Sequence, residues 1–276
     1  MKIIRDIITS RNNPTVKWAA SLSAKKGRDS ARSFIAEGEK LSVEALEAGL
    51  PVSHIFISES KYARAFEKIS PWISDEKYSN TEVITLSDSA FEKISTEISP
   101  QGIISVIKYL DFFREIDIIY KEEFFIEPNE RVIILSSVRD PGNLGSVIRS
   151  ATAFGVDHII LTADSADLYN PKTVRSAMGS LFRVKATVVS DVKSFVKAMI
   201  ENGRRVFAAE LSEGALPLSE VGLRACDAVI IGNEGHGIPR ELASVATGSV
   251  YIPISRRTES LNAAVAAAIF MWEQGK

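Results

Sequence analysis

Residues 252–270 read IPISRRTESLNAAVAAAIF, which is a short β-type run, a polar loop and a helix that is apolar nearly all round. Such a helix is typical of a buried element. Upstream of it, the continuous β-branched run RVIILSSV (131–138) fits a strand buried on both faces, and DAVIIGNEG (227–235) reads as a buried strand that runs into a loop. Between them, GNLGSVIRSATAFG (142–155) reads as a helix closed by a glycine. The alternation predicts a mostly parallel sheet flanked by helices over residues 131–276.

The chain upstream of residue 109 alternates in the same way. Pro14 is well placed to open a helix through residues 16–26, and FIAEG (34–38) reads as a short strand. We therefore expect a smaller α/β domain over residues 1–108. The segment 109–130 is charged and aromatic and fits neither period, so we interpret it as a linker or surface extension.

Composition places the chain among soluble globular proteins. Of its 276 residues, 45% are hydrophobic and 25% are charged, which is close to average usage. The N-terminus has no apolar signal-like region, and the longest apolar stretch, residues 263–272, is too short to span a bilayer. We therefore expect a cytoplasmic protein with no membrane partner. One cysteine and three scattered histidines predict neither an internal disulfide nor a metal site.

Three loops that follow predicted strands are the candidate site, because ligands of open α/β sheets collect at the carboxyl ends of the strands. These loops are DPGNLGSVIRS (140–150), IGNEGHGIP (231–239) and IPISRRTESLN (252–262). Glycines at 232, 235 and 237 do not have the G-x-G-x-x-G spacing, and no G-x-x-x-x-G-K-[ST] occurs. A dinucleotide dehydrogenase and a P-loop NTPase are therefore disfavoured.

Taken together, the three loops resemble the SpoU/TrmH branch of the SPOUT methyltransferases. The residues that match its motifs are Asn143 and Arg149 in the first loop, Gly232 and Glu234 in the second, and Ile252, Pro253, Ser260, Leu261 and Asn262 in the third. Upstream, ITSRNNPTVK (8–17), SFIAEGEKLSVEAL (33–46) and SPQGIISVI (99–107) are similar to the family's N-terminal substrate-binding domain. One departure is the spacer SRRTE, where the family commonly has a glycine, and it predicts a different loop shape.

The resemblance implies a C-terminal α/β trefoil-knot domain and a smaller, ribosomal-protein-like α/β domain that binds substrate. It also implies S-adenosylmethionine as methyl donor, a homodimer, and transfer to a ribose 2′-hydroxyl of RNA. Carried over onto this chain, Gly232, Ile252 and Leu261 are the candidates for donor contacts.

The catalytic residues implied by the resemblance are Arg149, Asn143, Glu234, Ser260 and Asn262. A guanidinium is a poor base, so we expect Arg149 to bind the adjacent phosphate and stabilise charge on the 2′-oxygen. The two asparagines can hold the ribose or Arg149. Ser260 lies where we expect a helix N-cap, and Glu234 could order its loop. His236 is an alternative general base outside the family's catalytic set.

Two basic patches are candidates for RNA contact, because a net charge of −2 leaves such binding to local patches. The predicted RNA-binding residues are Lys25, Lys26, Arg28 and Arg32 in AKKGRDSAR, and Arg256 with Arg257. A solvated helix end is the alternative interpretation of each patch.

The leading hypothesis is a 2′-O-methyltransferase acting on large-subunit ribosomal RNA. A tRNA substrate is the nearest alternative within the same chemistry. A hypothesis of another class is an RNA-binding or ribosome-assembly factor that keeps the fold without catalysis.

Overall fold

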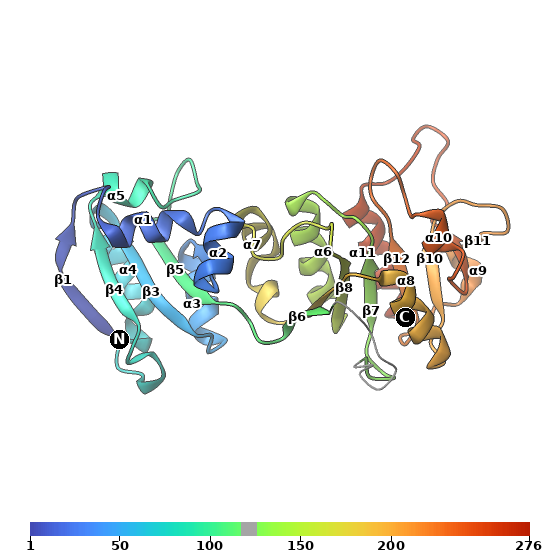
Figure 1. Ribbon diagram of the computed structural model, residues 1–276, viewed down its shortest axis with the longest axis horizontal. Helices are drawn as coiled ribbons and strands as arrows, with labels where there is room; N and C mark the ends of the chain where they lie inside the picture. The colour runs from blue at the N-terminus through green and yellow to red at the C-terminus, as the bar shows by residue number, and fades with distance from the viewer. Residues whose placement is uncertain (117–125) are drawn as a thin grey trace. The chain divides into compact units, whose positions relative to one another are not determined.

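The computed structural model describes residues 1–116 and 126–276. Residues 117–125, which fall in the predicted linker, lie outside the described residues. The chain divides into two compact units, one of residues 1–110 with 167–182 and one of residues 111–166 with 183–276. Each unit combines helices with a sheet of its own (Figure 1).

The first unit is built on a mixed five-stranded sheet. Its strands, in spatial order, are β1 (Lys2–Ile8), β4 (Glu82–Leu86), β3 (Val52–Ser58), β5 (Ile103–Lys108) and β2 (Ser33–Glu37). The pairs β1–β4 and β4–β3 are parallel, whereas β3–β5 and β5–β2 are antiparallel. The edge strand β1 was not anticipated, because its side chains are almost all exposed and show no alternation of burial.

The first helix begins as the sequence predicts but ends earlier. Helix α1 (Pro14–Ser21) opens at Pro14, with the Asn13 side chain accepting a hydrogen bond from Thr15 N. The chain then breaks and resumes as α2 (Lys25–Ala31). A Cβ on Gly27 would lie 2.1 Å from the Ser21 carbonyl oxygen, so this glycine permits the two helices to approach closely.

A segment from the second half of the sequence completes the first unit. Residues 167–182 contain α7 (Pro171–Ala177) and a 3-10 turn (Met178–Phe182), and α7 packs on β2. Tyr169 stacks on Tyr109 with ring centroids 4.0 Å apart. The other helices of this unit are α3 (Glu39–Glu47), α4 (Tyr62–Ile69) and α5 (Asp88–Glu92), with 3-10 turns at Glu59–Lys61, Ser70–Trp72 and Glu76–Tyr78.

The second unit is built on an eight-stranded sheet whose pairs are all parallel. Its strands, in spatial order, are β11 (Leu216–Pro217), β13 (Gly248–Tyr251), β10 (Val206–Ala209), β12 (Ala228–Ile231), β7 (Val132–Leu135), β8 (His158–Thr162), β9 (Lys185–Val189) and β6 (Phe113–Ile116). The predicted parallel α/β sheet is therefore confirmed. Strand β6 is a difference, because it lies in the segment interpreted as a linker and pairs with β9.

The helices of this unit are α6 (Pro141–Ala153), α8 (Val192–Glu201), α9 (Leu218–Val221), α10 (Arg240–Ala243) and α11 (Ala263–Gln274). Helix α11 packs against α6 and β12. It is not buried on all sides, since Val265 and Trp272 are 49% and 56% exposed. None of the described helices is both long and apolar enough to cross a bilayer.

Candidate active site

Three of the predicted residues, each from a different loop, form a chain of hydrogen bonds. Asn143 Nδ2 donates to Glu234 Oε1 at 2.5 Å, and Asn262 Nδ2 donates to Asn143 Oδ1 at 3.0 Å. The loops meet because β7, β12 and β13 belong to one parallel sheet, so their carboxyl ends share an edge. Asn143 lies in the first turn of α6, where its N–H donates to the Asp140 cap at 2.8 Å.

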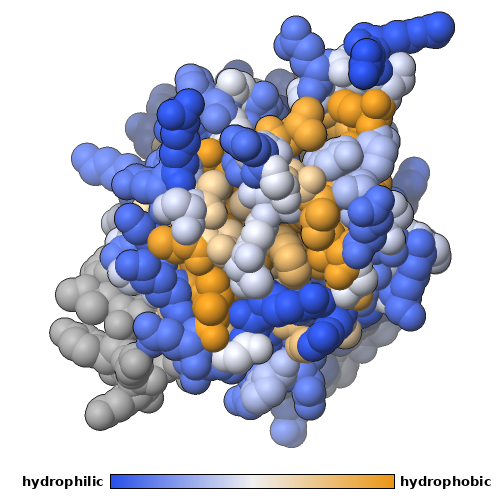
Figure 2. Space-filling view, turned by 90° about the vertical axis from the view of Figure 1, so that its right-hand side faces the viewer, coloured by the Kyte–Doolittle hydropathy of each residue, from blue (hydrophilic) through white to orange (hydrophobic). Residues whose placement is uncertain are grey.

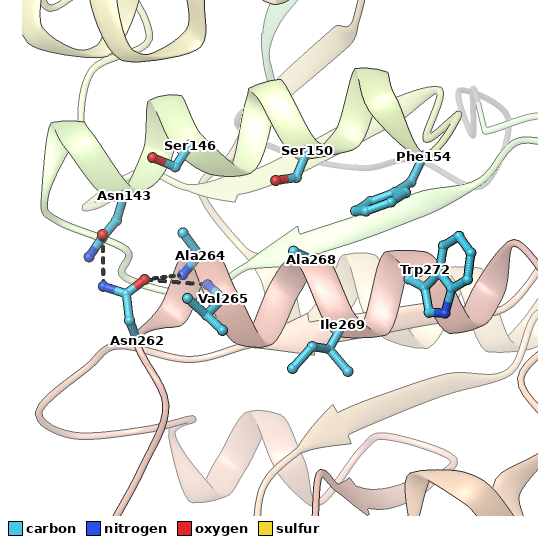
Figure 3. A pocket seen from close by; sticks show the side chains of 10 residues that line it. All are labelled: Asn143, Ser146, Ser150, Phe154, Asn262, Ala264, Val265, Ala268, Ile269 and Trp272. Carbon is cyan, nitrogen blue, oxygen red and sulfur yellow. Dashed lines mark hydrogen bonds between the residues drawn. The ribbon is translucent and has the colours of Figure 1, made fainter.

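The helix that follows the third loop is capped by Asn262. Its Oδ1 accepts hydrogen bonds from Ala264 N at 2.9 Å and Val265 N at 3.3 Å. The prediction that Ser260 caps this helix is therefore wrong by two residues, because α11 starts only at Ala263. Asn262 thus uses its oxygen to hold the helix and its nitrogen to hold Asn143 (Figure 3).

The second loop turns tightly around Asn233, a residue that the sequence analysis did not single out. Asn233 Oδ1 accepts from Gly235 N at 2.9 Å and His236 N at 3.2 Å, and Nδ2 donates to the Ser137 carbonyl at 2.8 Å. Its backbone is paired with that of Gly237. The signal was present in the sequence as an asparagine followed closely by glycines, which is typical of an Asx turn.

The loop before α6 is held by a cluster of side chains that hydrogen-bond to one carboxylate, that of Asp164. Asp164 accepts hydrogen bonds from Ser137 Oγ at 2.7 Å, Arg139 at 2.8 Å and Thr162 Oγ1 at 2.7 Å. Burial alone would raise the pKa of Asp164, but hydrogen bonds from Arg139, Thr162 and Ser137 outweigh it and lower this pKa to about 2. Ser137 has a φ of 57°, a left-handed conformation that this cluster stabilises.

A cavity of about 730 Å³ lies beside these loops. It is lined by residues from three strand ends, those of β10, β12 and β13, and from helix α11: Ala209, Glu210, Leu211, Ile231, Gly232, Asn233, Glu234, Gly237, Val250, Tyr251, Ile252, Pro253, Ile254, Ser255, Arg256, Thr258, Glu259, Ser260, Leu261, Ala263, Ala266 and Phe270. All three predicted donor contacts are among them. The contribution of residues 209–211, at the carboxyl end of β10, was missed because the loop there carries no motif.

The cavity combines apolar walls with glycine backbone. A Cβ on Gly232 would lie 2.4 Å from the Gly237 carbonyl carbon, so only glycine fits there. Val250 and Phe270 are buried, whereas Leu211 is 81% exposed. Figure 2 shows the end of the second unit that carries β11 and α9, where apolar surface lies in the centre and hydrophilic side chains surround it.

Arg149 is not joined to this cluster. It is exposed on α6 and has no hydrogen bond or ion pair with any residue of 1–116 or 126–276. It lies six residues after Asn143, and at about 1.5 Å per residue this is roughly 9 Å farther along the helix axis.

The predicted RNA-binding cations differ in exposure. Lys25, Lys26 and Arg32 are exposed on the first unit, and Arg256 and Arg257 are exposed on the second. The Arg32 guanidinium also lies over the Tyr109 ring, 4.6 Å from its centroid.

Arg28 is the exception, since it is only 2% exposed. Its guanidinium donates to the carbonyls of Leu22 at 3.0 Å and Ser23 at 2.8 Å and forms an ion pair with Asp167. Arg28 therefore ties α2 to the preceding loop and to the segment 167–182, and it is not a surface cation. Arg28 is buried by the packing of a segment distant in the sequence, and its neighbours in the sequence do not indicate this burial.

A second hollow, a groove of about 510 Å³, runs between α6 and α11. Figure 3 shows Asn143 and Asn262 at one end of it and Phe154 and Trp272 at the other. It is lined by Asn143, Ser146, Ser150, Phe154, Asn262, Ala264, Val265, Ala268, Ile269 and Trp272. The groove is therefore a largely apolar surface that begins at the asparagine pair.

Comparison with known proteins finds a matching family model in each unit. The model of the SpoU rRNA Methylase family matches residues 130–272, and the MRM3-like substrate binding domain matches residues 13–105. A 23S rRNA (guanosine(2553)-2′-O)-methyltransferase, RlmP of Bacillus subtilis, is 32% identical over 96% of this chain and 97% of its own length.

A 23S rRNA (uridine(2479)-2′-O)-methyltransferase of Streptomyces viridochromogenes is 29% identical over 96% of this chain and 90% of its own. The structure of an AdoMet-bound rRNA methyltransferase from Sinorhizobium meliloti superposes with a TM-score of 0.80 and 29% identity, covering 99% of this chain and 97% of that one.

Proposed function

The chain belongs to the SpoU rRNA methylase family, as its three loop motifs predicted, and on this premise we propose that it methylates a ribose 2′-hydroxyl of large-subunit ribosomal RNA. The methyl donor is S-adenosylmethionine. The observation that carries the proposal is the hydrogen-bonded chain Glu234–Asn143–Asn262 beside a cavity lined by the predicted donor contacts. The relatives that methylate 23S rRNA support the choice of substrate.

The cavity fits such a donor in size and lining. Its volume of about 730 Å³ lies within the range of roughly 300–1,000 Å³ usual for small-molecule sites. Ile231, Val250 and Phe270 offer an apolar wall for an adenine ring. Gly232 and Leu261 line the same cavity, and their backbone groups are the candidates to hold the polar edges of that ring. When bound, the donor supplies a methyl group on a sulfonium sulfur, which becomes a neutral thioether as the ribose oxygen gains the methyl group and loses its proton.

The side chains of the cluster position the ribose. Glu234 holds the Asn143 amide, and Asn143 in turn receives the Asn262 amide, so the rotamers of both asparagines are set before substrate arrives. Because a guanidinium is a poor base, the role of Arg149 is to bind the adjacent phosphate and stabilise charge that develops on the 2′-oxygen. The proton passes to water or to a phosphate oxygen.

We further propose that the protein acts as a homodimer through the groove between α6 and α11. The exposed apolar side chains Val265 and Trp272 lie on this face, and a second copy of the same face would cover them in a two-fold interface. Arg149 lies on α6, apart from the cluster of its own copy, so we infer that its catalytic role depends on this assembly. A Trp272→Glu variant should then elute as a monomer that still binds donor and no longer transfers methyl groups. A monomeric wild-type protein with full activity would contradict the dimer.

RNA capture falls to the exposed cations. Lys25, Lys26 and Arg32 on the first unit and Arg257 on the second can neutralise phosphates, and affinity should fall steeply with salt. A ribosomal RNA substrate would be met in the cytoplasm.

The decisive experiment is mass-spectrometric mapping of ribose methylation in total RNA from cells with and without this gene. Loss of one 2′-O-methyl group in large-subunit RNA, restored by the wild-type gene and not by an Asn143→Ala variant, is the expected result. Loss of a methyl group from tRNA would establish the alternative substrate. Donor binding without any change in RNA methylation would favour a non-catalytic assembly factor.

Arg149→Lys tests the role given to the guanidinium. Because lysine keeps the charge and lacks the planar fork, methyl transfer at saturating RNA should fall strongly. Near-full activity of this variant would show that bidentate phosphate recognition is not needed.

A further inference from the structure

The spacer SRRTE of the third loop carries two adjacent arginines whose surroundings differ. Arg256 lines the donor cavity, whereas Arg257 is not among its lining residues. The Arg257 N–H donates to Ser255 Oγ at 3.3 Å, within a turn. Arg256 is not among the residues with positive φ, so the loop holds its side chain without backbone strain.

Arg256 is the one cationic side chain among the described residues that line the cavity. Within the described ranges its guanidinium has no hydrogen bond or ion pair. Three carboxylates line the same cavity. Glu210 accepts a hydrogen bond from Ser249 Oγ at 2.9 Å, and Glu234 accepts one from Asn143. The third carboxylate, Glu259, lies on the same loop as Arg256.

The charges of the donor restrict what Arg256 can contact. S-Adenosylmethionine carries a positive sulfonium and a positive ammonium group, and both would be repelled by a guanidinium. Its only anionic group is the α-carboxylate of the amino-acid tail. A guanidinium presents a planar fork of donors that matches a carboxylate in a bidentate arrangement.

We propose that Arg256 binds the α-carboxylate of the methyl donor, and so selects donors that carry the complete amino-acid tail. This inference rests on the proposed function and separates Arg256 from Arg257, which remains an RNA contact. The spacer SRRTE thus supplies a recognition element for the donor.

The test uses two probes that differ in the tail. S-Adenosylhomocysteine keeps the α-carboxylate, whereas 5′-methylthioadenosine lacks the whole amino-acid portion. Titration calorimetry without RNA measures both with the wild-type protein, Arg256→Gln and Arg257→Gln, the last as a control for loss of one charge on the same loop. Arg256→Gln should lower the affinity for S-adenosylhomocysteine about tenfold, the loss expected for one charged hydrogen-bonded contact, and leave the affinity for 5′-methylthioadenosine unchanged. Arg257→Gln should change neither affinity.

Three results would overturn the assignment. Unchanged S-adenosylhomocysteine affinity with weakened RNA binding in Arg256→Gln would make Arg256 an RNA contact. Equal weakening of both probes would show that it only shapes the loop. Absence of S-adenosylhomocysteine binding by the wild-type protein would instead overturn the proposed function itself, and with it this assignment.

Discussion

Substitution of Gly232 by alanine should destabilise the second unit and weaken binding of the methyl donor, if the proposed cavity is its site. The new Cβ would lie 2.4 Å from the Gly237 carbonyl carbon, 2.6 Å from its oxygen and 2.7 Å from Ile238 N. All three atoms belong to the backbone, so no side-chain rotation can relieve the overlap. The loop must open by about 1 Å to bring the 2.4 Å contact to an ordinary 3.4 Å, at the point where Asn233 and Gly237 exchange hydrogen bonds of 3.0 and 2.9 Å.

The cost follows from these contacts. Forcing one methyl group into a packed site costs about 1–3 kcal/mol, and each weakened backbone hydrogen bond adds up to about 1 kcal/mol. We therefore expect a loss of about 2–3 kcal/mol, against a total stability of about 5–15 kcal/mol. For a domain of this size the loss corresponds to a decrease in Tm of roughly 4–12 °C. Because the displaced loop lines the cavity, donor affinity should fall at least about tenfold.

Calorimetric unfolding and titration with S-adenosylhomocysteine measure the two effects. Gly235→Ala is the matched control in the same loop, since its Cβ would meet nothing closer than Asn233 Oδ1 at 3.5 Å. This control should unfold and bind like the wild-type protein. If Gly232→Ala had the Tm and donor affinity of Gly235→Ala, the close approach of the two loop segments would be refuted as the reason for glycine at this position.

Three further predictions concern other parts of the site and the first unit. Asn262→Ala should lower stability by about 1 kcal/mol through loss of the helix cap, whereas Asn262→Ser should keep the cap and still reduce methyl transfer because the amide bond to Asn143 is lost; equal activity of Asn262→Ser and wild type would contradict this role. The pKa of Asp164 is lowered to about 2 in the folded protein, so its stabilising contribution is present above its ordinary pKa of 3.8 and is lost as pH falls towards 2; Asp164→Asn should therefore flatten the unfolding free energy measured between pH 4 and 2 relative to wild type. Arg28→Ala should lower the free energy of unfolding, measured with denaturant, by about 3 kcal/mol because the carbonyl and carboxylate partners of Arg28 lose their donor. Lys26→Ala should leave stability unchanged and lower the salt dependence of RNA binding. The reverse pattern would show that Arg28, and not Lys26, contacts RNA.

Much of the fold could be predicted because its signals are local. The apolar runs that form β7 and β12 read as strands, and Pro14 marked a helix start. The parallel sheet followed from the alternation of strand-like and helix-like segments. Local signals failed where distant segments decide. Strand β1 is exposed and shows no alternation, and residues 167–182 join the first unit although the sequence places them within the second.

The candidate site shows the same division. The motifs identified Asn143, Glu234 and Asn262 one by one, but only the shared edge of the sheet shows that they form one hydrogen-bonded chain. The predicted helix cap at the third loop, Ser260, lies two residues before the observed cap, Asn262, because the start of a helix depends on which side chain reaches the free N–H groups.

By itself, the sequence determined the α/β class, the mostly parallel pairing in the second sheet and the family, since these depend on hydrophobic period and on motifs within single loops. The tertiary structure alone decided that Arg28 is buried against a segment about 140 residues away, that Arg256 and not Arg257 lines the cavity beside the three loops, and that Gly232 has no room for a methyl group. The physical reason is that burial, partner and available space are properties of residues that meet in space, and spacing along the chain does not specify which residues meet.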